Sequence, residues 1–128
     1  MIEASNGNSA AAHAAKDDPL HPSNIGRFNG FLHASPNALA NASEKSSIGM
    51  ISKLYAAELG FYLATGAEIN ATNMASLLEQ VANKPLTPEL ITAINDKLAE
   101  ASLVDPLLYG MSDKALLADQ IISAATLN

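Results

Sequence analysis

The side chains that can act as bases or metal ligands are few and lie far apart along the chain. The three histidines, His13, His21 and His33, have spacings that match no compact metal-binding motif. They also fall in a stretch rich in Gly, Pro, Ser and Asn, where a general base is poorly held against its target. We therefore interpret them as solvated histidines, and we expect no catalytic residue and no bound metal ion.

Two acidic patterns have the spacing of a metal site but lack its chemistry. Asp96 and Glu100 lie one helical turn apart, where carboxylates can share a proton or bind a cation, although such pairs more often form a solvated helix face. Residues 68–79 place oxygen-bearing side chains at several ligand offsets of a calcium-binding loop. That loop needs Asp first and Gly sixth, whereas this chain has Glu68 and Asn73 there. We interpret residues 68–79 as a loop followed by a capped helix.

Composition excludes several functional classes. The chain has no cysteine, so it forms no disulfide, thiolate nucleophile or iron–sulfur cluster. Seven basic and thirteen acidic residues give a net charge of −6, and Arg27 is the single arginine. Proteins that bind nucleic acids concentrate Lys and Arg on one face, so we expect no nucleic-acid partner. We expect no cofactor either, because no cofactor-binding motif is present.

The sequence predicts no transmembrane segment and no cleavable signal peptide. The longest apolar stretch, residues 48–64, is interrupted by Lys53 and Glu58. The first residues lack the basic start and apolar centre of a signal peptide. We expect a protein that is either cytoplasmic or secreted without a cleavable signal peptide.

Apolar periodicity predicts an all-α fold, a small bundle of four main helices. Ala and Leu dominate the chain and only two Val occur, which favours helices over strands. The predicted helices span about 46–65, 72–82, 87–103 and 112–125. Thr87-Pro88-Glu89 and Asp105-Pro106 are typical helix starts, and Gly66 is a typical helix end. In the last helix, Leu116 and Leu117 are both expected to face inward.

A change of composition near residue 44 predicts two regions. Residues 1–43 contain few large apolar side chains and are expected to form a largely disordered N-terminal segment, while residues 44–128 form the helical bundle domain. One short amphipathic helix is predicted at 24–34 within the segment. Its apolar face either enters a groove on another protein or packs onto its own domain; it consists of Ile25, Phe28, Phe31 and Leu32.

The predicted helix at 46–65 is apolar on most of its sides. Ile51, Tyr55 and Leu59 form one stripe, Gly60 belongs to a neighbouring stripe of small residues, and a third side carries Met50, Leu54 and Phe61. Such a helix lies either at the centre of a bundle or at a contact with another chain. The small stripe also suits close packing against a second copy.

These patterns favour a non-enzymatic helical protein that acts by protein–protein interaction, through another protein or through self-association. The predicted partner-binding residues are Ile25, Phe28, Phe31, Leu32, Met50, Leu54, Gly60 and Phe61. In composition, residues 1–43 are similar to substrates of signal-peptide-independent secretion systems, which implies a bacterial secreted or exported factor. The alternative is a carrier of a small apolar ligand, or an enzyme, with a pocket in the bundle interior; its expected lining is Tyr55, Tyr62, Met74 and Tyr109.

Overall fold

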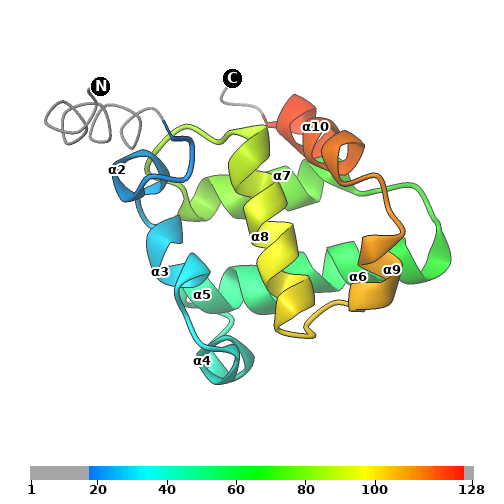
Figure 1. The fold of residues 1–128 in the computed structure, drawn as a ribbon, viewed down its shortest axis with the longest axis horizontal. Helices are drawn as coiled ribbons and strands as arrows, with labels where there is room; N and C mark the ends of the chain where they lie inside the picture. The colour runs from blue at the N-terminus through cyan, green and yellow to red at the C-terminus, as the bar shows by residue number, and fades with distance from the viewer. Residues whose placement is uncertain (1–17, 126–128) are drawn as a thin grey trace, which may run out of the picture.

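The computed structural model describes residues 18–125, and every regular element within them is a helix (Figure 1). The all-α prediction is confirmed, and its four main helices correspond to the longest elements of the structure. The first is continuous from α5 (Ser47–Gly49) through the π-helix η1 (Met50–Tyr55) into α6 (Ala56–Thr65). The others are α7 (Ala71–Val81), α8 (Pro88–Glu100) and α10 (Lys114–Ala124).

The ends of the long helices follow from local sequence. The Thr87 side chain accepts a hydrogen bond from the Leu90 amide at 3.1 Å, and Pro88 occupies the first turn. Asn70 caps α7 by accepting from the Asn73 amide at 3.3 Å, so residues 68–79 are a loop and a capped helix, as predicted. Gly66 ends α6 in the left-handed conformation, with φ 69°.

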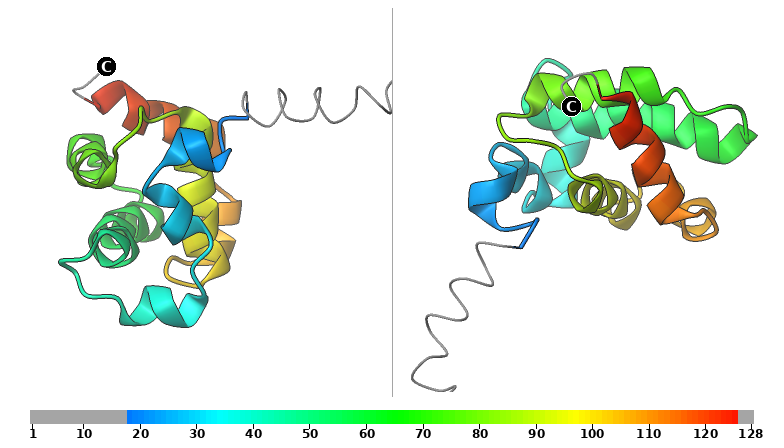
Figure 2. Two further views of the ribbon diagram at one scale, coloured as in Figure 1. Left: turned by 90° about the vertical axis from the view of Figure 1, so that its left-hand side faces the viewer. Right: turned by 90° about the horizontal axis from the view of Figure 1, so that it is seen from above.

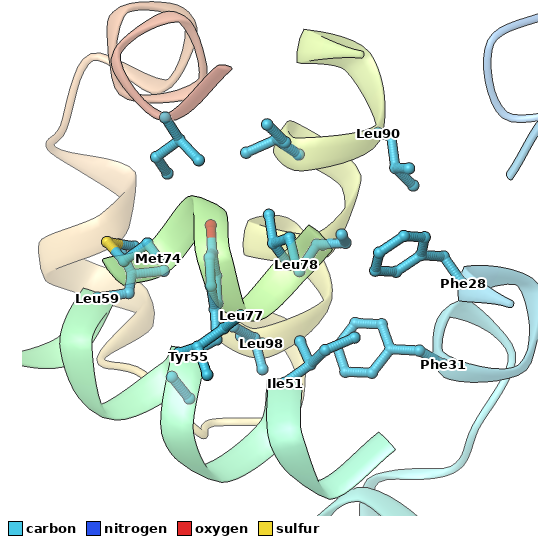
Figure 3. Packing of buried hydrophobic residues seen from close by; sticks show 14 of the residues in the cluster. Phe28, Phe31, Ile51, Tyr55, Leu59, Met74, Leu77, Leu78, Leu90 and Leu98 are labelled. Atoms are coloured by element: carbon cyan, nitrogen blue, oxygen red, sulfur yellow. The ribbon is translucent and has the colours of Figure 1, made fainter. Parts of the chain in front are cut away.

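The long helices enclose one hydrophobic core. Helix α10 packs against α7 and α8, α7 packs against η1, and the short helix α9 (Pro106–Gly110) contacts α6 and α8. Figure 3 shows Tyr55, Leu59 and Met74 between the helices, close to Leu77 and Leu78. These side chains are buried together with Ile91, Ile94 and Leu98 of α8.

The folded domain begins before residue 44, where the change of composition placed its start. Residues 22–41 form α2 (Pro22–Ile25), α3 (Phe28–Leu32) and α4 (Pro36–Asn41), which lie against the long helices (Figure 2). They bury Ile25, Phe28, Phe31 and Leu39 almost completely. The expectation of disorder is therefore corrected for this part, because four large apolar side chains lose their contact with water on docking. Residues 1–17 lie outside the described residues.

The predicted helix at 24–34 is divided into two. Gly26 has φ 55°, which interrupts the helix, and a Cβ atom there would lie 2.0 Å from Oδ1 of Asn83. The next amide, that of Arg27, donates to the same Oδ1 at 2.9 Å. The break thus attaches the N-terminal helices to the loop between α7 and α8.

A membrane-spanning helix is not found between residues 18 and 125, where each helix is too short or too polar to cross a bilayer.

Candidate functional site

Within residues 18–125, both histidines lie at the ends of short helices. His21 caps α2, where its Nδ1 accepts from the Ser23 amide at 3.2 Å, and His33 is exposed at the end of α3. His13 lies outside the described residues. Across residues 18–125, no group of three or more His, Asp and Glu side chains is close enough to hold a metal ion.

Two buried tyrosines each donate a hydrogen bond to a side chain of α8. The Tyr55 hydroxyl donates to Oδ1 of Asn95 at 2.6 Å, and the Tyr109 hydroxyl donates to Oδ1 of Asp96 at 2.7 Å. Burial raises the pKa of both hydroxyls well above the usual tyrosine value; the neighbouring Tyr109 adds to the effect at Tyr55, and Asp96 adds to it at Tyr109. Both groups therefore stay neutral, and they connect α8 to η1 and α9. Sequence reasoning missed this role of Asp96, because nothing in its spacing indicates a distant tyrosine.

The predicted partner-binding residues of the N-terminal part lie in the chain's own core. Ile25, Phe28 and Phe31 are fully buried, and Leu32 is half-buried against the same cluster. In Figure 3 the rings of Phe28 and Phe31 point from α3 toward Ile51 and the core. Of the two alternatives, the structure shows packing onto the chain's own domain, and these side chains offer no free apolar face.

The four predicted residues on the central helix are divided between core and surface. Met50 is half-buried against the core, and Gly60 is half-buried with nothing within 4 Å of the place where a Cβ would stand. Gly60 therefore makes no close contact with another helix of the described residues. Leu54 is 37% exposed and Phe61 is 62% exposed, so both present apolar surface to solvent.

Leu54 and Phe61 lie two turns apart on one side of the central helix, with the exposed residues Ala57 and Ala64 on the same side. We call these four residues the α6 surface. Two shallow hollows border it. One of about 390 Å³ is lined by Leu54, Ala57, Glu58, Asn73 and Leu77. The other, of about 410 Å³, is lined by Glu58, Phe61, Tyr62, Glu68, Ile69 and Asn70.

A second group of exposed apolar side chains lies where α9 is followed by α10. Leu107 is 75% exposed, Met111 80% and Leu116 53%, and we call them the α9 corner. Sequence reasoning missed this corner and wrongly expected Leu116 to face inward. The signal was weak, because α10 has apolar residues on several sides and Leu117 occupies the buried position instead.

The interior where the ligand-carrier alternative expects a pocket is filled by side chains. Tyr55 and Met74 have no exposed surface and Tyr109 is 3% exposed, while Tyr62 lines a hollow at the surface beside Leu116. Comparison of the chain with protein-family models, curated proteins and solved structures finds no match.

Proposed function

We propose that this protein acts by binding another protein through the α6 surface. The observation that carries the proposal is the exposure of Phe61 and Leu54, each beside a partly apolar hollow. Solvation of an aromatic ring costs free energy that a partner recovers by covering it, and aromatic side chains beside pockets are typical anchors of protein interfaces. The surface lies on the longest continuous helical stretch of the described chain, which holds it in a fixed geometry.

The α6 surface is favoured over the α9 corner because both of its large apolar side chains line a hollow, whereas the hollow at the α9 corner is lined by Leu116 and by neither Leu107 nor Met111. Leu54 and Phe61 each line one hollow, so anchors from a partner can enter beside them. Leu107 belongs to a single helical turn, and Met111 follows that turn directly. Exported localisation in a bacterium, suggested by the composition of residues 1–43, remains part of the proposal.

The test is site-specific photo-crosslinking in the source cells. A photoreactive phenylalanine analogue replaces Ala57, which is exposed at the middle of the α6 surface. We expect a protein adduct of defined mass, and we expect it to disappear when Phe61→Arg is added. The matched control carries Leu107→Arg, a similar change of an exposed apolar residue in the α9 corner, and keeps the adduct.

Each alternative outcome has a clear meaning. An adduct that persists with Phe61→Arg but disappears with Leu107→Arg assigns binding to the α9 corner and overturns the proposal. Absence of any adduct in cells where the protein is abundant also contradicts it. Circular dichroism of each purified variant establishes that the change acts on binding rather than on folding.

A further inference from the structure

Glu58 borders the α6 surface at the two hollows. It lines both of them, one turn after Leu54 and three residues before Phe61. The residue is half-buried, and its Oε2 accepts a hydrogen bond from Nδ2 of Asn73 on α7 at 2.5 Å. Because an amide is neutral, this hydrogen bond orients the carboxylate without compensating its charge.

The neighbouring charges leave this region negative. Neither hollow has a Lys or Arg in its lining, and Glu68 adds a second carboxylate to the hollow beside Phe61. The basic residue closest to Glu58 along the helix is Lys53. Its Nζ donates to the backbone carbonyl of Ala40 on α4 at 2.9 Å, which holds it toward α4. A partner that covers this surface must therefore bring its own positive charge, or leave a partly desolvated carboxylate unpaired.

The same charges disfavour a second copy of this chain as the occupant. In a two-fold symmetric contact centred on this surface, the Glu58 carboxylates of both copies would lie in the same interface. Like charges in an apolar, partly dry contact repel strongly. The occupant that fits is a different chain with a cation between apolar groups.

We infer that the α6 surface binds a segment of another protein that presents two apolar residues with a Lys or Arg between them. Leu54 and Phe61 are seven residues apart, so they are separated by about 10 Å along the helix axis at 1.5 Å per residue. A helical partner matches that separation with apolar residues at i and i+7. Its cation then lies at i+3 or i+4, opposite Glu58. This inference rests on the proposed function and names the chemistry of the partner.

The test is a selection that needs no known partner. A displayed library of helical peptides with randomised positions on one face is selected against the full chain, and the enriched peptides are synthesised. We expect them to carry Lys or Arg between two apolar residues about two turns apart. Calorimetric titration should show binding weakened about tenfold by Glu58→Gln, because a charge-assisted hydrogen bond is lost. The carboxamide of Gln retains an acceptor for Asn73, so the fold is kept.

A matched control and three outcomes complete the experiment. Glu100→Gln, at an exposed carboxylate near the end of α8, should leave affinity within about twofold. Peptides that lose binding with Phe61→Arg but not with Glu58→Gln overturn this inference and leave the proposed function standing. Failure to enrich any peptide that depends on Phe61 overturns both. A concentration-dependent dimer, seen by sedimentation and abolished by Phe61→Arg, assigns the surface to self-association and also overturns the inference.

Discussion

Replacing Phe28 by Ala should lower the free energy of unfolding far more than the same change at Phe61. Phe28 has no exposed surface and packs in the central cluster, whereas Phe61 is 62% exposed. Removing a buried phenyl ring loses its transfer free energy and leaves a cavity, at a cost of about 3–5 kcal/mol. The exposed ring loses little on truncation, and Ala is the better helix former, so Phe61→Ala should change stability by less than about 1 kcal/mol.

The assay is urea unfolding of the two variants and the wild type, followed by circular dichroism. A whole domain is stable by only about 5–15 kcal/mol, so Phe28→Ala removes a large fraction of the total and shifts the midpoint strongly. Because the two variants delete the same atoms, their difference reports burial alone. If Phe28→Ala costs no more than Phe61→Ala, the N-terminal helices do not belong to the cooperative core and our account of residues 22–41 is refuted.

Three further predictions concern polar burial, pH and close packing. Tyr55→Phe should cost about 1–3 kcal/mol in urea unfolding, because it leaves Oδ1 of Asn95 buried without a partner, and adding Asn95→Leu should recover most of that loss. The pKa values of Tyr55 and Tyr109 in the folded protein lie above the unfolded value of about 10, so their contribution to the free energy of unfolding is fully present below pH 10. This contribution is lost above pH 10, by up to about 1.4 kcal/mol per pH unit for Tyr55 alone. Urea unfolding measured between pH 8 and 11 should show a decline in stability, and Tyr55→Phe should make that decline shallower. Gly49→Ala should prevent stable folding, because its Cβ would lie 1.7 Å from a backbone carbonyl oxygen in the α4–α5 loop. Gly60→Ala meets open space and should raise the melting temperature slightly, and a destabilised Gly60→Ala would contradict the geometry.

The regular part of the fold could be predicted because its signals are local. Helices begin at Thr87-Pro88 and at Asp105-Pro106, as the sequence predicts, because the capping side chain and the proline that follows it determine a helix start locally. The order and type of the four long helices follow from apolar periodicity in the same way. Detail within the central helix did not follow, because nothing in residues 50–55 distinguishes a π-helix from an α-helix.

The N-terminal helices could not be placed from sequence because their stability is not local. Two Gly residues lie within 26–30, and neither α2 nor α3 exceeds five residues, so neither is stable alone in water. These helices are stabilised by the burial of Ile25 and Phe28 in the core and by a hydrogen bond to the side chain of Asn83, which is more than fifty residues away. Average composition underestimates the tendency of such a segment to fold, because a few large apolar side chains decide whether it packs against the rest of the domain.

The packing of α2 and α3 onto the core leaves only one of the two predicted partner-binding regions exposed. Sequence alone distributes the apolar residues between two partner-binding regions, one at 24–34 and one on the central helix. Once α2 and α3 cover part of the core, Ile25, Phe28 and Phe31 are buried within the chain. The central helix is covered on the sides that face α3, α7 and α9. In the described part of the chain, the side of that helix with Leu54 and Phe61 stays uncovered, and Glu58 places a carboxylate beside these two apolar side chains. Apolar contact alone would accept many partners, whereas a fixed carboxylate beside two hollows discriminates against every segment that lacks a cation at the matching position.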